Sequence, residues 1–159
     1  MSKSEIGCAL SHIKIYKEIV RSKIDCALVL EDDAIFLREF TKNLKEFILN
    51  NFRYKKQIIL LSELWEFYKK PLDKKKNYEV VDVTNAYFTH SYFINKGAAR
   101  ALENFNFPVK TVADNFIIFK IYCGIKITGL NPYILGQDKK KFISSIKFTS
   151  DLRKIFLFK

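Results

Sequence analysis

The sequence predicts an α/β domain with a mostly parallel sheet flanked by helices. Short, continuous apolar runs at residues 26–30 and 57–62 are typical of strands that are covered on both faces, as in a parallel sheet. Segments with a helical spacing of apolar residues alternate with these runs, which is the pattern of an α/β domain. With 159 residues, 48% of them hydrophobic, the chain is long and apolar enough to fold as one domain.

The first predicted element is a helix over residues 4–21. Ser2 followed by Glu5 has the form of a capping box, which marks a helix start. At about 100° per residue, Glu5, Cys8 and His12 form a stripe beside the apolar face and not within it. The apolar face is expected to consist of Ile6, Ala9, Leu10, Ile13 and Val20.

Strands and helices alternate through the rest of residues 1–138, which we interpret as one catalytic-type core, followed by a basic amphipathic tail at residues 139–159. In chain order, we expect a strand at 26–30, a helix at 41–51, a strand at 57–62, a lysine-rich loop at 71–77, strands at 78–83 and 86–94, helices at 96–105 and 116–122, and a strand at 126–128.

The formal net charge is +11, and a basic protein attracts anions of many kinds. Nucleic acid, a nucleotide-sugar diphosphate and an anionic membrane surface are all candidates, and lysines that are simply solvated are the plain alternative. No helix-turn-helix, zinc-finger or RNP-like pattern is present, so a nucleic-acid-binding module is the weakest interpretation. The tail at residues 139–159 has the composition of a segment that binds anionic lipid or packs on the domain.

The cysteines and the apolar runs indicate the cellular compartment in which we expect the protein to reside. Cys8, Cys26 and Cys123 are odd in number and widely spaced, which favours buried or half-buried thiols in a reducing compartment. No signal peptide is visible, and no apolar run approaches the roughly 20 residues that span a bilayer. We therefore expect a cytoplasmic protein, and the basic tail leaves open a peripheral position at the inner face of the cytoplasmic membrane.

Three adjacent carboxylates, Glu31, Asp32 and Asp33, directly follow the first predicted strand. Such groups repel one another unless a cation compensates them, and the C-terminal ends of strands are where open α/β sheets bind ligands. In an extended chain Glu31 and Asp33 project to the same side, which suits a hard cation such as Mg²⁺ or Mn²⁺ that also binds a diphosphate. The alternative is an acidic turn that caps the next element.

Three further residues have open roles. Asp114 precedes the predicted helix at 116–122, where it would serve as an N-cap, as a general base that deprotonates an attacking hydroxyl, or as both. His12 is either a hydrogen-bonded structural residue or a ligand. His90 is expected to be a core or edge histidine.

These motifs resemble those of a known enzyme family. Residues 5–12 (EIGCALSH), Tyr16 and residues 27–33 (ALVLEDD) are similar, in sequence and in separation, to the centre of glycosyltransferase family 25, which includes lipooligosaccharide galactosyl- and glucosyltransferases. The resemblance extends through residues 92–99 and 108–114 to Asn131, Pro132, Gln137 and residues 144–146.

The resemblance implies a GT-A-like nucleotide-diphospho-sugar fold and an inverting transfer of a hexose from a UDP-sugar to a lipooligosaccharide or LPS acceptor. It assigns the DxD role to residues 31–33: Asp33 and Glu31 as ligands of Mn²⁺ or Mg²⁺, and Glu31 and Asp32 at the nucleotide-sugar. It also makes Asp114 the candidate base that activates the acceptor hydroxyl. Three more residues match the family motif without an assigned role: Glu5, Ser11 and His12.

One departure from the family pattern also carries an expectation. Family members usually begin with a strand that carries an Asn-Leu and Arg-rich pattern and opens the nucleotide-binding half, whereas here Met1 stands just before the EIGCALSH motif. We therefore expect an N-terminally incomplete fold with little or no transferase activity on its own. An inactive remnant and a partner subunit of such an enzyme are the corresponding alternatives.

Overall fold

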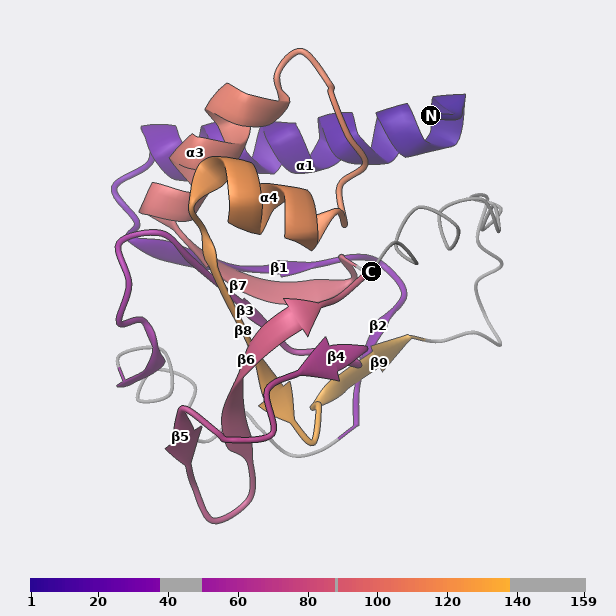
Figure 1. The fold of residues 1–159 in the computed structure, drawn as a ribbon. Helices are drawn as coiled ribbons and strands as arrows, with labels where there is room; N and C mark the ends of the chain where they lie inside the picture. The colour runs from indigo at the N-terminus through magenta and orange to yellow at the C-terminus, as the bar shows by residue number, and fades with distance from the viewer. Residues whose placement is uncertain (38–49, 88, 138–159) are drawn as a thin grey trace.

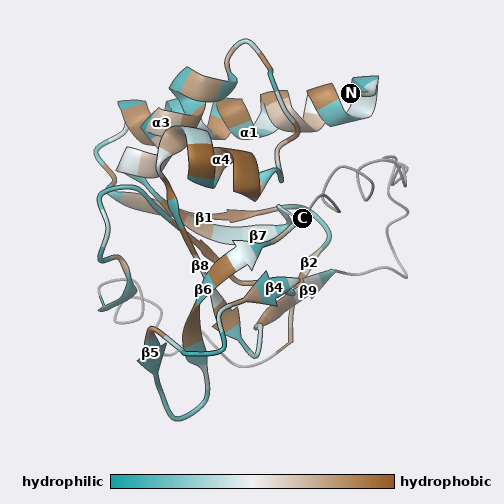
Figure 2. Ribbon diagram, in the orientation of Figure 1, coloured by the Kyte–Doolittle hydropathy of each residue, from teal (hydrophilic) through white to brown (hydrophobic). Residues whose placement is uncertain are grey.

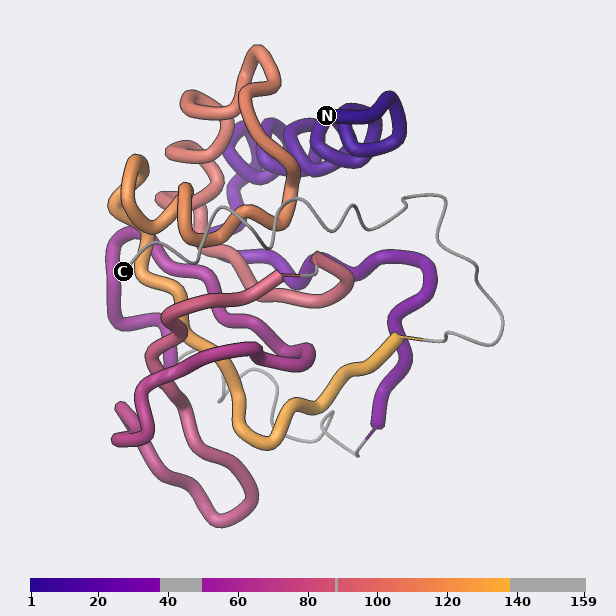
Figure 3. The backbone as a smooth tube through the Cα atoms, turned by 45° about the vertical axis from the view of Figure 1, so that its right-hand side comes forward, coloured from indigo at the N-terminus to yellow at the C-terminus, as the bar shows by residue number. Residues whose placement is uncertain are grey.

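The structure, a computed structural model, describes residues 1–37, 50–87 and 89–137. The described helices all lie over one face of a central sheet, and a small two-stranded sheet lies beyond its other side (Figures 1 and 3). The helices are α1 (Lys3–Arg21), α3 (Lys96–Asn106) and α4 (Phe116–Cys123). The strands are β1 (Cys26–Leu30), β2 (Ala34–Phe36), β3 (Gln57–Leu60), β4 (Glu66–Phe67), β5 (Asp73–Lys74), β6 (Glu79–Asn85), β7 (Ser91–Asn95), β8 (Lys126–Asn131) and β9 (Leu135–Gln137).

The central sheet has the order β1-β7-β3-β8-β6-β4, with β5 paired to β6. Within the described ranges, β3 and β8 form its one parallel pair, and every other pair is antiparallel. The prediction of a mostly parallel sheet is therefore wrong, although the mixture of helices and strands is confirmed. Burial on both faces produces the continuous apolar runs, and such burial does not depend on strand direction.

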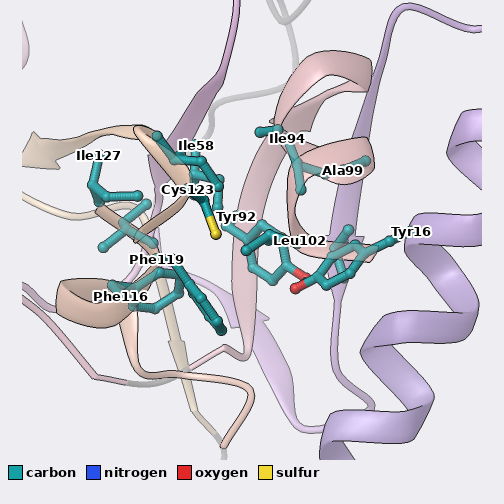
Figure 4. Packing of buried hydrophobic residues seen from close by; sticks show 14 of the residues in the cluster. Tyr16, Ile58, Tyr92, Ile94, Ala99, Leu102, Phe116, Phe119, Cys123 and Ile127 are labelled. Atoms are coloured by element: carbon teal, nitrogen blue, oxygen red, sulfur yellow. The ribbon is translucent and has the colours of Figure 1, made fainter. Parts of the chain in front are cut away.

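Both faces of the sheet are covered by apolar side chains, which explains those runs. Under the helices lies one cluster that includes Tyr16, Tyr92, Phe116 and Phe119 (Figure 4). A second cluster on the other face includes Phe93. In Figure 2, β1 and α4 are largely hydrophobic, whereas the loop around β5 is hydrophilic. The sheet therefore lies between two apolar layers.

Helix α1 starts with the predicted capping box, because the Ser2 hydroxyl accepts from the Glu5 backbone N–H and the Glu5 carboxylate accepts from the Ser2 N–H. Its buried face is rotated from the one expected. Ile6 and Leu10 are 37% and 44% exposed, while the buried residues are Ala9, His12, Ile13, Tyr16 and Ile19. His12 therefore belongs to the face that packs on α3 and the sheet, and not to a stripe beside it.

Two other predicted elements differ in detail. The strand expected at residues 86–94 begins only at Ser91, and the described residues 86, 87, 89 and 90 are not part of a strand. The N-cap of α4 is Asn115, whose side chain accepts from the Ile118 N–H at 3.3 Å, so the N-cap role expected for Asp114 is wrong by one residue. Gly124, in the left-handed region at φ 62°, ends α4.

The predicted helix at 41–51, apart from its last two residues, and the tail at 139–159 lie outside the described residues. Within the described ranges, none of the helices combines the length and the apolar character that a bilayer crossing requires.

Gly97 offers a test of the packing at the start of α3. A Cβ at this position would overlap the backbone carbonyl oxygen of Lys55, which cannot move away as a flexible side chain does. We expect Gly97→Ala to lower the free energy of unfolding by about 1–3 kcal/mol, the usual cost of overpacking. Gly7→Ala is the matched control, because a Cβ there meets nothing within 4 Å and the exposed helix position should gain about 0.5–1 kcal/mol. Urea denaturation of both variants measures the difference, and equal stabilities would contradict this packing.

Candidate functional site

The three carboxylates directly follow β1, an edge strand of the described sheet, as the sequence predicts. The Glu31 N–H donates to the His90 carbonyl oxygen at 3.0 Å, which ties this end of β1 to the segment that leads into β7. The Ala34 N–H then donates to the Glu31 carbonyl oxygen at 3.2 Å, which closes a turn into β2. The turn places residues 31–33 between the two sheets.

Glu31 is held by two other parts of the chain. Its Oε1 atom lies 3.2 Å from His12 Nε2 on α1 and accepts a hydrogen bond from the Thr89 hydroxyl. Burial on its own raises the pKa of Glu31. The hydrogen bonds from His12 and Thr89 and the nearby charges of His12 and His90 outweigh burial, so the net pKa lies below the usual range of a glutamate. Glu31 is therefore an anchored carboxylate.

His12 connects Glu31 to two buried tyrosines. Its Nδ1 atom lies 2.7 Å from the Tyr92 hydroxyl, which in turn lies 3.2 Å from the Tyr16 hydroxyl (Figure 4). Both tyrosines are buried, and burial raises the pKa of each, so they remain neutral hydroxyls. A continuous chain of polar contacts therefore runs from the core through His12 to Glu31, and it fixes the orientation of the imidazole.

Asp33 has a different partner. Gln137 on β9 donates from Nε2 to Asp33 Oδ2 at 2.6 Å, because the antiparallel pairing of β2 and β9 brings the two residues together. Asp33 Oδ1 is buried and has no hydrogen-bond partner among the described residues. Asp32 is exposed. The structure thus gives the three adjacent carboxylates three different environments.

A pocket of about 210 Å³ lies beside these residues. Gln137, which donates a hydrogen bond to Asp33, lines this pocket. His90, whose charge lowers the pKa of Glu31, lines it as well. His90 is buried, in line with the core or edge position expected for it, and it also faces this pocket. The lining residues are Ile35, Leu37, Glu63, His90, Tyr133, Gly136 and Gln137.

Asp114 is half-buried in the turn before α4. Burial, the charge of Glu31 and the charge of Asp114 together raise the pKa of Cys8 to about 11. Glu31 and Asp114 are therefore both close enough to Cys8 to disfavour its thiolate form.

Glu5 and Ser11 match the family motif but do not point into this region. Glu5 completes the capping box of α1, and the exposed Ser11 hydroxyl donates to the Gly7 carbonyl oxygen at 3.0 Å. These hydrogen bonds give both residues local roles in the helix. Among the motif residues on α1, Cys8 and His12 are the ones that face Glu31.

Thr89 is a site residue that the sequence analysis missed. It lies just before β7, and no apolar spacing in the sequence singles it out. Its role depends on a contact with Glu31 across 58 residues of sequence. Gln137 appeared only as part of the family resemblance, and its contact with Asp33 spans 104 residues.

The structure thus combines helices over one face of a mixed sheet with carboxylates at a strand end beside a pocket. Residues 1–117 match the family model described as "Glycosyltransferase family 25 (LPS biosynthesis protein)". The chain therefore belongs to glycosyltransferase family 25.

Curated relatives are similar over most of the chain. This chain is 28% identical over 146 residues to "Procollagen galactosyltransferase 2" of Homo sapiens; the aligned region covers 89% of this chain and 23% of that protein. It is also 28% identical over 137 residues to "Procollagen lysyl hydroxylase and glycosyltransferase" of Acanthamoeba polyphaga mimivirus; that alignment covers 79% of this chain and 14% of that protein. The chain thus spans less than a quarter of the length of these relatives.

The lowered pKa of Glu31 predicts a pH-dependent contribution to stability. Because its pKa in the folded chain lies below the ordinary value of 4.5, the carboxylate stabilises the fold above that value, and the contribution is lost as the pH falls through the folded pKa. We expect Glu31→Gln to be less stable than the wild type at pH 7, with the difference shrinking below about pH 4. Thermal unfolding from pH 7 to pH 3 measures this.

The control for that experiment is Glu18→Gln, which removes the same charge from an exposed position on α1. A difference between Glu31→Gln and wild type that stays constant with pH would contradict the anchored carboxylate.

Proposed function

We propose that this chain transfers a hexose, galactose or glucose, from a UDP-sugar to a hydroxyl of a lipooligosaccharide or LPS acceptor, with inversion at the anomeric carbon. Membership of glycosyltransferase family 25 supports a sugar transfer, and relatives named as galactosyltransferases support a hexose. The observation that carries the proposal is the environment of Asp33.

Asp33 fits a role as a cation ligand. Gln137 fixes one carboxylate oxygen, while the other is buried and has no partner among the described residues, although an unpaired buried carboxylate oxygen is costly. A hard cation such as Mn²⁺ or Mg²⁺ binds carboxylate oxygens and would satisfy this atom. Asp33 would hold the cation, with Glu31 or Asp32 assisting. When bound, the cation supplies positive charge for the departing diphosphate.

The residues of this chain have separate tasks in the proposed transfer. Gln137 orients Asp33, and His12 and Thr89 keep Glu31 ionised and in place. The pocket beside Gln137 and His90 receives part of the donor. Asp114 accepts the proton of the acceptor hydroxyl as that oxygen attacks the anomeric carbon from the side opposite the leaving diphosphate.

Asp33 is tested by cation binding. We expect Asp33→Asn to weaken Mn²⁺ binding in the presence of UDP by at least about tenfold, because the buried oxygen loses its charge. Asp25→Asn is the matched control, since Asp25 is an exposed carboxylate at the other end of β1. Titration calorimetry gives both affinities. Equal Mn²⁺ affinity of the Asp33 variant and the wild type would remove Asp33 from the cation site.

Asp114 is tested by kinetics. Removal of a general base commonly lowers the rate by about 10²–10⁴-fold, so Asp114→Asn should reduce kcat to that extent and leave donor affinity nearly unchanged. Turnover of UDP-galactose and UDP-glucose measures kcat, and calorimetry with UDP measures donor binding. A variant that retains wild-type turnover would show that another group accepts the proton.

The acceptor is tested in the same assay. Lipooligosaccharide and a hydroxylysine-containing collagen peptide are offered in parallel, because relatives carry procollagen in their names. The proposal expects transfer to lipooligosaccharide. Transfer to the peptide alone would replace the acceptor and keep the reaction. No transfer to either acceptor, from either donor, would remove the proposed activity of this chain and favour the alternatives of an inactive remnant or a partner subunit.

A further inference from the structure

Cys8, His12 and Glu31 form a compact cluster of metal-ligating groups next to the Asp33 site. One ligand atom from each residue lies within 4.8 Å of the other two. Cys8 and His12 are four residues apart on α1 and so share a face of the helix, while Glu31 approaches from the end of β1. Asp33 does not belong to this cluster.

We propose that Cys8, His12 and Glu31 bind a divalent cation that accepts thiolate and imidazole ligands, with Zn²⁺ as the best match, at a site that does not include Asp33 and that leaves Asp32 as the residue assisting the cation at Asp33. Sulfur, nitrogen and oxygen donors together suit Zn²⁺, whereas Mg²⁺ and Mn²⁺ prefer oxygen donors. Three protein ligands leave the fourth tetrahedral position for water or a substrate atom.

The distances suit such a centre. Two ligand atoms on one tetrahedral Zn²⁺ ion lie about 3.3–3.5 Å apart, given metal–ligand bonds of about 2.0–2.3 Å. His12 Nε2 and Glu31 Oε1 are 3.2 Å apart, which already matches. The Cys8 sulfur lies within 4.8 Å of a ligand atom on each of the other two residues. It therefore needs to approach them by no more than about 1.5 Å, which a side-chain rotation provides.

The groups around the ligands are of the kind that supports a bound metal ion. A metal-bound histidine usually makes a hydrogen bond through its other ring nitrogen, and His12 Nδ1 already contacts the Tyr92 hydroxyl at 2.7 Å. This contact directs Nε2 toward Glu31. Thr89 donates to the same Glu31 oxygen and so orients the carboxylate. Each of these two ligands therefore has an outer partner.

Charge and access also favour a cation. Two carboxylates, Glu31 and Asp114, lie close enough to Cys8 to raise the pKa of its thiol, so the electrostatic potential at the thiol is negative. A divalent cation offsets that charge. The Glu31 side chain is 32% exposed and Cys8 is half-buried, while His12 is buried, so an ion can enter from solvent and meet the imidazole last.

Cobalt absorption tests the site on the purified full chain. Co²⁺ replaces Zn²⁺ in such sites, and a thiolate bound to it gives a near-ultraviolet charge-transfer band. We expect this band in the wild type, in Cys26→Ser and in Cys123→Ser, its loss in Cys8→Ser, and its disappearance when Zn²⁺ but not excess Mg²⁺ is added. A wild type without the band, or a band that persists in Cys8→Ser, overturns the proposal.

A second measurement needs no variant, in case Cys8→Ser fails to fold. The wild type is treated with iodoacetamide with and without Zn²⁺, and mass spectrometry follows the alkylation of each cysteine. We expect Zn²⁺ to slow the modification of Cys8 by at least tenfold, while Cys26, which is also half-buried, serves as the internal control. Equal rates at Cys8 with and without Zn²⁺ overturn the proposed site.

Discussion

The contact between His12 and Glu31 connects the helical layer to the end of β1, and the arrangement of the site depends on it. An imidazole buried under a helix is costly unless both ring nitrogens have partners, and here Tyr92 and Glu31 supply them. His12 lies with Ala9, Ile13, Tyr16 and Ile19 on the buried face of α1, while Ile6 and Leu10 are exposed. The two polar partners therefore permit His12 to lie on the buried face of this helix.

The sequence predicted most elements of the fold, because each element depends on neighbouring residues. The bounds of α1, β1 and α3 follow from local periodicity and caps, and they were predicted to within a residue or two. Strand direction was not predictable in this way. The strands of the sheet are apolar because both faces are covered, and an antiparallel strand such as β7 meets that condition as well as a parallel one.

For the site, too, features that depend on neighbouring residues could be predicted and features that depend on distant contacts could not. The position of residues 31–33 at a strand end could be predicted, since the apolar run stops there. Their separate environments could not, because they depend on contacts with Thr89 and Gln137 that are distant in sequence. For the same reason the spacing of Cys8 and His12 was visible as a stripe on one helix, while the approach of Glu31 to both became visible only in the folded chain.

The pairing of β2 with β9 has a consequence for the order of folding. Its contact between Asp33 and Gln137 closes a loop of 104 residues, and long loops are closed late because their ends lose more entropy when they meet. The loop contains β3, β6, β7, α3, α4 and β8, which are packed into the two clusters of the core. Leu135 of β9 is itself buried in the second cluster, and Ala34 of β2 packs against that cluster, so closure of this loop completes the core and the pocket wall together.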